Sequence, residues 1–387
     1  MDDRARRPRS VLATVWILLA CAAVGTGIGL AVRAVRDGGD AGPRAIKVRP
    51  ARPGPQPPAA LWLFGVRTVR LDPTTLTDAR DVGFQGFGSV LGGAGVVYLF
   101  DPGTGRFGVV DATRNRRVET TLPVETGAPV DVTPVFAVQG NALWLVTGPG
   151  RVTRYDLSTG TATEVELPRD VVSEAEVGGP PAPGATRIVA DDDAVWVAYQ
   201  LGVTGNPPVT AVVRLAPDGT VTARASLPPT APGGGRLEPQ SVAVGGGAVW
   251  IVGRAAVVAL DADSLAMRQG FAVQTETPVE LHDAAFAAGM LWSYDATSSA
   301  LLRIGEDGRV RARIPLTDGA PPPVPAPASI VGSRDALWVR VRTSASTLEQ
   351  RVTRVDARSG DITGRFDAPA ELEIGAIAVS RPLDRTT

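Results

Sequence analysis

Residues 241–273 read SVAVGGGAVWIVGRAAVVALDADSLAMRQGFAV and contain four short apolar segments separated by turn residues. A glycine turn occupies 245–247, and an aspartate turn begins at Asp261. The predicted strands are 241–244, 248–252, 255–260 and 267–273. Their length, their apolar and β-branched content and the hairpin spacing of the turns predict one four-stranded antiparallel sheet.

The second of these strands contains an aromatic residue that recurs along the chain at intervals of 36 to 54 residues. The recurring aromatic residues are Trp62, Tyr98, Trp144, Trp196, Trp250, Trp292 and Trp338. Four-stranded units with this period are typical of propeller blades, so the sequence predicts an all-β, seven-bladed β-propeller of antiparallel blades over residues 60–380, with a tail at 381–387. We interpret the aromatic residues as packing residues, because the second strand of a blade is covered on both faces by its neighbours.

The two ends of the repeat region predict how the ring closes. The first unit begins with its second strand at Ala60, because the proline-rich segment before it cannot supply a first strand. A matching apolar segment occurs at the other end, at Ile374–Val379. We expect it to pair beside Ala60–Phe64, which would remove the open edge of the first blade.

The N-terminus predicts where the protein works. Residues 11–32 are an uncharged apolar run of 22 residues, long enough to cross ~30 Å of hydrocarbon as a helix. Arginines in the 1–10 tail predict that this tail is cytoplasmic and that 11–32 is a single-pass signal anchor in the cell membrane. The Pro- and Gly-rich segment 33–59 then reads as a linker, and the C-terminal domain is expected outside the cytoplasm.

Two other interpretations of the N-terminus remain open. The sequence around Cys21, the single cysteine, resembles both a lipoprotein signal and a signal-peptidase site. Either cleavage would still place the remainder outside the cytoplasm. The net charge of −1 offers no basic surface, so we expect no nucleic-acid partner.

Long connections predict a binding face. In a propeller, the connections from strand two to three and from strand four to the next blade lie on one face. All the long segments singled out here fall in those connections, and they are 168–184, 200–208, 228–239, 317–327 and 343–350. Insertions gathered on one face typically mark the binding face. We expect a monomer that binds a protein, peptide or cell-envelope ligand there as a non-catalytic scaffold.

Repeats such as Val213–Val221 (VRLAPDGTV) and the Ala-Val-Trp strands after glycine turns resemble the seven-bladed propellers of the streptogramin B (virginiamycin B) lyase-like superfamily. The resemblance covers residues 60–380. The turn at Asp156–Gly160 also resembles quinoprotein repeats, but the tryptophan that follows the turn there is missing, so we expect no quinone.

The resemblance implies an alternative function, a metal-assisted lyase or hydrolase with His282 as general base and Mg²⁺ as cofactor. Glu280 and Asp295 match two metal-ligand positions, whereas Gln240 stands where the family has a histidine. In the binding hypothesis no cofactor is expected, and Glu238, Gln240 and Glu373 join these residues as a polar rim at the mouth of the central channel. The nearby carboxylates predict a His282 pKa above its ordinary ~6.5.

Overall fold

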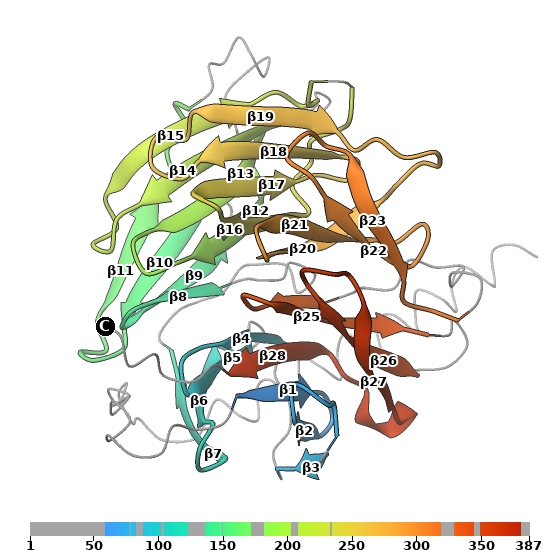
Figure 1. Ribbon diagram of the computed structural model, residues 1–387. Coiled ribbons are helices and arrows are strands. Elements are labelled where there is room, and N and C mark those ends of the chain that lie inside the picture. Colours follow the sequence, from blue (N-terminus) through green and yellow to red (C-terminus); the bar gives the residue numbers. More distant parts are fainter. Residues whose placement is uncertain are drawn as a thin grey trace, which may run out of the picture. The chain divides into compact units, whose positions relative to one another are not determined.

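The computed structural model describes residues 59–77, 79–82, 88–101, 104–122, 136–148, 150–171, 182–202, 208–232, 234–318, 329–343 and 349–380. Their strands form seven four-stranded antiparallel sheets, which confirms the predicted seven-bladed β-propeller (Figure 1). The predicted anchor 11–32 and nearly all of the linker 33–59 lie outside the described residues. No helix among the described residues combines the length and apolar character needed to span a membrane.

Each blade runs from an innermost first strand to an outermost fourth strand, and the first strands of neighbouring blades contact one another around the ring. Blades one to three contain β28 (Ala376–Ser380), β1 (Ala60–Phe64), β2 (Thr68–Leu71) and β3 (Arg80–Asp81); β4 (Ser89–Gly92), β5 (Val96–Asp101), β6 (Arg106–Asp111) and β7 (Arg116–Thr121); β8 (Phe136–Gln139), β9 (Ala142–Gly148), β10 (Arg151–Asp156) and β11 (Ala162–Glu166). Blades four and five contain β12 (Ala182–Ala190), β13 (Val195–Gly202), β14 (Val209–Leu215) and β15 (Val221–Leu227); β16 (Ser241–Gly245), β17 (Ala248–Val252), β18 (Ala256–Asp261) and β19 (Met267–Ala272). Blades six and seven contain β20 (Leu281–Ala287), β21 (Met290–Asp295), β22 (Ala300–Ile304) and β23 (Val310–Pro315); β24 (Ser329–Gly332), β25 (Ala336–Arg342), β26 (Gln350–Asp356) and β27 (Ile362–Ala368), after which comes the short 3₁₀ helix η1 (Ala370–Leu372).

Ring closure follows the predicted pairing. Strand β28 lies antiparallel to β1, with Ala376 opposite Phe64 and Ser380 opposite Ala60, and Figure 1 shows the red strand beside the blue one. The strand begins two residues later than predicted, because Ile374 and Gly375 belong to the connection; the Gly375 N–H donates to the Phe64 carbonyl oxygen at 2.7 Å. The first blade therefore combines strands from both ends of the domain.

The second-strand aromatic residues are buried between blades, as predicted, and none is more than 8% exposed. Five of the six tryptophans lie directly opposite an arginine on the third strand. These pairs are Trp62–Arg70, Trp144–Arg154, Trp196–Arg214, Trp292–Arg303 and Trp338–Arg354. The sequence interpretation did not include the arginines.

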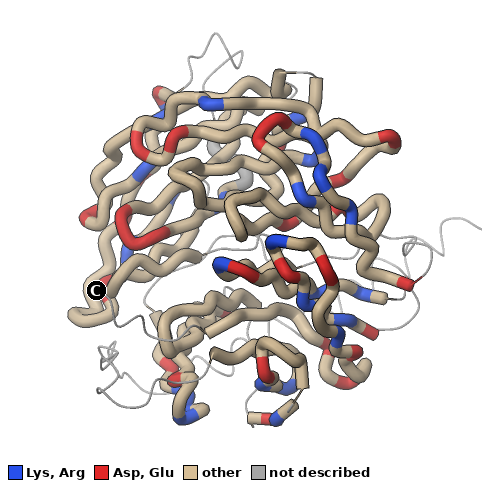
Figure 2. Tube along the Cα trace, in the orientation of Figure 1, with Lys and Arg blue, Asp and Glu red and all other residues tan. Residues whose placement is uncertain are grey.

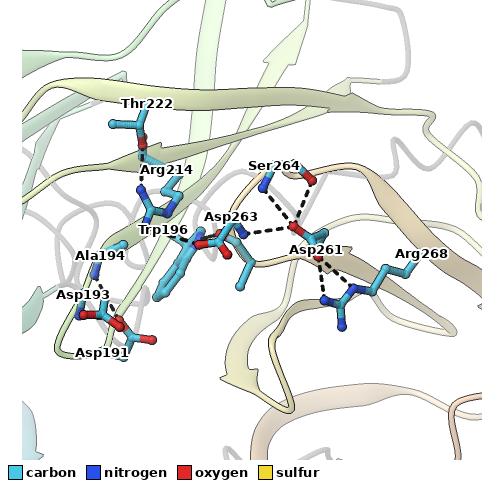
Figure 3. Close-up of polar contacts among 11 residues, drawn as sticks. Asp191, Asp193, Ala194, Trp196, Arg214, Thr222, Asp261, Asp263, Ser264 and Arg268 are labelled. Atoms are coloured by element: carbon cyan, nitrogen blue, oxygen red, sulfur yellow. Dashed lines mark hydrogen bonds and ion pairs between the residues drawn. The ribbon is translucent and has the colours of Figure 1, made fainter.

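In four of these five pairs the arginine contacts the outer turn, between strands three and four, of the next blade; the pair in blade seven is the exception. Trp196 and Trp338 also contact the outer turn of the next blade. Figure 3 shows the contact between blades four and five, where the Trp196 Nε1–H donates to the Ala262 carbonyl oxygen at 2.9 Å and Arg214 lies 3.6 Å from Asp263. Asp261 orders that turn by accepting the backbone N–H groups of Asp263 and Ser264. The corresponding contacts elsewhere are Arg70 to Asn115, Arg154 to the Pro217 carbonyl, Arg303 to the Arg358 carbonyl and Trp338 to the Pro73 carbonyl. We call these contacts the outer locks.

The connections between strands one and two are two to four residues long, and those between strands three and four are four to five residues long apart from 72–79. This confirms that the long connections belong to the other class. Of the five long segments predicted, only 228–239 is described almost completely; each of the others contains residues outside the described ranges. We call the face of the propeller that carries these connections the long-connection face.

Removal of β28 tests the closure. A protein truncated after Ala370 would leave the inner edge of β1 unpaired, and we expect it to lose cooperative urea unfolding when circular dichroism is followed. Removal of 381–387 alone is the control and should leave the transition unchanged. Coincident transitions for the intact protein and the protein truncated after Ala370 would contradict this closure.

A pair of matched substitutions measures one outer lock. Trp196→Phe removes the hydrogen bond to the Ala262 carbonyl, whereas Trp144→Phe removes an indole of equal size whose Nε1 is buried without a hydrogen-bond partner. We expect Trp196→Phe to lower the free energy of unfolding by about 1 kcal/mol more than Trp144→Phe, because only the first change breaks a hydrogen bond. Urea unfolding followed by fluorescence provides the comparison, and equal losses would show that the lock contributes nothing.

Candidate functional site

Two first strands carry bulges near the long-connection face. In β20 the pairing with β21 shifts between Leu281 and Ala284, so that His282 and Asp283 together oppose a single residue. In β12 the pairing with β13 shifts between Pro183 and Thr186, and Arg187 is the second residue after regular pairing resumes. A bulge re-aims the side chains beside it and is over-represented next to functional sites.

The predicted trio in blade six comes together only in part. The Glu280 N–H donates to Asp295 Oδ1 at 3.1 Å, so the start of the first strand and the end of the second do meet. The His282 Nε2 lies 3.8 Å from Glu280 Oε1. Asp295, however, faces the turn that follows it: its carboxylate also accepts the Thr297 N–H and the Ser298 hydroxyl, and it is completely buried.

These contacts test whether the residues fit a magnesium ion. The oxygens of Asp295 accept three hydrogen bonds from neutral donors, and a fourth partner, the Arg313 guanidinium, lies 3.5 Å away. Glu280 is paired with Arg254 at 3.0 Å. Mg²⁺ prefers an octahedral shell of open oxygen ligands and several waters, which this arrangement does not offer. Among the described residues there is also no group of three His, Cys, Asp or Glu side chains that could hold a metal ion.

The rim residues predicted in blade five belong to an ion-pair network. Arg254 lies between Glu280 and Glu238, 3.6 Å from the latter, and Arg236 lies 3.5 Å from Glu238. Gln240 turns back on its own chain, and its Nε2 donates to the Glu238 carbonyl oxygen at 3.3 Å. The carboxylates at this rim are therefore matched by arginines.

Glu373 lies apart from this network, in the connection that leads to β28. It follows η1 in a left-handed backbone conformation with φ 40°, and its N–H donates to the Ala370 carbonyl. Within the described part of the chain, no hydrogen bond or ion pair joins its side chain to Glu238, Gln240 or His282.

The expectation that the His282 pKa lies above 6.5 is wrong. Burial lowers the pKa of His282 below its ordinary 6.5, because the charged imidazolium is poorly solvated there. Glu280 favours the charged form, but it only partly offsets burial, and Arg254 adds to the lowering. The imidazole is therefore mainly neutral at pH 7.

The structure adds three charged residues that sequence reasoning missed: Asp283, Arg187 and Arg340. Asp283 Oδ2 accepts the Ile330 N–H at 2.7 Å, and its Oδ1 accepts the Ser241 hydroxyl at 3.3 Å, so one side chain joins the first strands of blades five, six and seven. Burial raises the pKa of Asp283, with these hydrogen bonds opposing the shift.

The two arginines extend this linkage to blades four and one. Arg187 Nε donates to the Gln240 carbonyl at 2.8 Å, and Arg340 NH1 donates to the Ile374 carbonyl at 2.7 Å and to Gln350 Oε1 at 3.0 Å. We call this set the inner belt: Arg187, Gln240, Ser241, Asp283, Ile330, Arg340 and Ile374. The available signal was a charged residue inside an otherwise apolar strand, as in LHDAAFA and ALWVRVR.

Comparison with known proteins supports the fold of this chain and does not identify its function. No model of a known protein family matches the chain, and no curated protein matches its sequence. Among solved structures, apo AztD from Citrobacter koseri is 12% identical, with 84% of this chain and 98% of AztD covered and a TM-score of 0.51. The dihydro-heme d1 dehydrogenase NirN in complex with DHE is 13% identical, with 86% and 78% covered and a TM-score of 0.50. The likeness is one of fold.

A titration of the single histidine tests the electrostatics of this site. We expect the His282 imidazole NMR signal to titrate below pH 6.5. Glu280→Gln should lower the pKa further, because it removes the favourable carboxylate, whereas Arg254→Gln should raise it. A wild-type pKa above 6.5, a rise in the pKa in Glu280→Gln or a fall in Arg254→Gln would refute the balance described here.

Proposed function

We propose that this protein is a binding module on the outer side of the cell membrane, tethered through residues 11–32 and followed by the linker 33–59. Its ligand, a protein, peptide or cell-envelope component, docks on the long-connection face where the inner belt lies. The belt and the rim around Arg254 would form the docking surface. The chain acts as a monomer and needs no cofactor for this role.

One observation carries the proposal: both bulged first strands place ionisable side chains beside the face with the long connections. His282 and Asp283 lie within the bulge of β20, and Arg187 follows Thr186, at which regular pairing resumes after the bulge of β12. Charged residues in the innermost strand of a blade reduce apolar packing, and burial of such groups costs free energy unless they are hydrogen-bonded. A binding role gives these positions a reason that ring stability alone does not.

The surface charge supports a specific ligand rather than a polyanion. Figure 2 shows arginines interspersed with aspartates and glutamates along the described trace. Mixed charge of this kind provides orientation and specificity in a protein or peptide interface. Nucleic acids instead favour a surface with clustered positive charge.

Photo-cross-linking in living cells tests the docking face. A photoreactive phenylalanine analogue would replace Thr230 or Thr277, which are exposed in connections of the long-connection face. Asp192 and Asp335, exposed in the short hairpins of the other face, are the matched controls. We expect adducts from the first pair and none from the second. Adducts only from the hairpin positions, or none from either pair, would overturn the proposal.

The second candidate function is a lyase with His282 as base, and one observation favours it. Burial keeps the imidazole neutral, which is the protonation state a base needs. If this function holds, the protein opens a cyclic depsipeptide ring in the presence of magnesium, and His282→Ala lowers that rate by ~10²–10⁴-fold while leaving the melting temperature nearly unchanged. No ring opening by the wild-type protein would eliminate this candidate.

A further inference from the structure

Arg187 differs from Arg236 and Arg254 in how its charge is matched. Its Nε donates to the Gln240 carbonyl at 2.8 Å, and its NH1 donates to the Thr186 carbonyl at 3.2 Å. Both acceptors are neutral. Within the described part of the chain, no carboxylate lies within 4.0 Å of this guanidinium, in contrast to Arg254 and Arg236.

The two carbonyl contacts fix the orientation of the guanidinium and leave its NH2 edge available. NH2 has no hydrogen-bond partner among the described residues, it is not one of the fully enclosed polar atoms without a partner, and Arg187 as a whole is half-buried. An arginine held on one edge is pre-organised, and little side-chain entropy is lost when a ligand binds its other edge.

Asp283 is the carboxylate with the largest electrostatic effect on Arg187, and it already accepts hydrogen bonds from other groups. Asp283 favours the charged form of Arg187, but its own oxygens accept the Ser241 hydroxyl and the N–H groups of Ile330 and Ala284. Asp283 also offsets the charge of Arg340, a second buried arginine whose pKa burial lowers to about 10. Asp283 thus acts on two arginines, and Glu238 is the second carboxylate that favours the charged form of Arg187 from beyond ion-pair distance.

Burial makes it energetically costly to leave the Arg187 guanidinium without a close counter-ion. Burial lowers the pKa of Arg187, which means that water solvates its charge poorly. A partly buried cation without a close counter-ion is unfavourable, and an anionic ligand group offsets that cost. Arg–carboxylate hydrogen bonds are roughly twice as strong as neutral ones.

We propose that the inner belt binds a carboxylate group of the ligand through the open edge of Arg187. The inference rests on the proposed binding function and specifies its ligand chemistry. A singly charged carboxylate suits the site better than a phosphate, because Asp283 and Glu238 lie near enough to act on Arg187 and would repel a second negative charge. The carboxylate is either the C-terminus of a peptide or the side chain of an acidic residue.

Three tripeptide probes distinguish these sources in calorimetric titrations of the purified protein at low salt. Acetyl-Ala-Ala-Ala has a free C-terminal carboxylate, acetyl-Ala-Asp-Ala-amide has only a side-chain carboxylate, and acetyl-Ala-Ala-Ala-amide has neither. We expect at least one carboxylate probe to bind about tenfold or more tightly than the uncharged amide. The stronger of the two identifies the source.

Variants connect the effect to Arg187. Arg187→Gln should abolish the preference for carboxylate, and Arg187→Lys, which keeps the charge without the fork, should retain part of it. Arg224→Gln is the control, because Arg224 is exposed on the outer strand β15 and pairs with Asp170 at 2.7 Å. Urea midpoints of all variants separate loss of binding from loss of folding, and Arg187→Lys remains informative if Arg187→Gln is unstable.

Equal affinity of the wild-type protein for all three probes, no binding of any probe, or a carboxylate preference that survives in Arg187→Gln would each overturn the inference. Failure here together with cross-links from Thr230 or Thr277 would leave the docking face intact and refute only the carboxylate chemistry. Loss of those cross-links would instead refute the proposed function itself.

Discussion

Every blade of this protein has two apolar faces, so each depends on the next blade to keep both faces out of water. The buried second-strand tryptophans satisfy this constraint, because they are large enough to fill the space between two sheets. The outer locks add hydrogen bonds and an ion pair, which are directional, to that apolar contact. Where a tryptophan or arginine reaches the following turn, as Trp196 reaches Ala262, the two blades are held in one register. At the junctions from blade two to three and from blade five to six, the second-strand aromatic residue lies opposite Val109 or Ala259 instead of an arginine. At the junction from blade five to six, Trp250 stacks on Phe286.

The fold could be predicted from the sequence because local patterns of strand and turn residues repeat along the chain. The recurring aromatic strand and its turns predict the blades, and the surplus apolar strand at Ile374–Val379 predicts closure. Site chemistry was less accessible. Asp283 was missed because its partners, Ser241 and Ile330, belong to other blades and meet only when the ring forms. The His282 pKa was predicted with the wrong sign, because neighbouring charges can be read from sequence but burial cannot.

Under the proposed function, ring stability and ligand recognition depend on different parts of the blade. The outer locks join second and third strands to outer turns beside the short-hairpin face, where they hold the ring together. The inner belt links the first strands, or the residues directly before them, of neighbouring blades beside the long-connection face, with Arg340 contributed by β25, and it carries charges that apolar packing would not favour. These hydrogen bonds also connect blades, and under the proposed function the same charges would bind the ligand. Asp295, which matches a metal-ligand position in sequence, instead orders a turn by accepting hydrogen bonds from Thr297 and Ser298.

The central claim is that lateral contacts make the seven blades one cooperative unit. Hydrogen exchange of the purified protein, followed by mass spectrometry across a urea transition, reports on each blade separately. The account predicts that peptides from β5, β9, β13, β17, β21 and β25 lose protection at one common urea concentration, together with β1 and β28. Earlier loss of protection in blades two and three, with the remaining blades still protected, would contradict it.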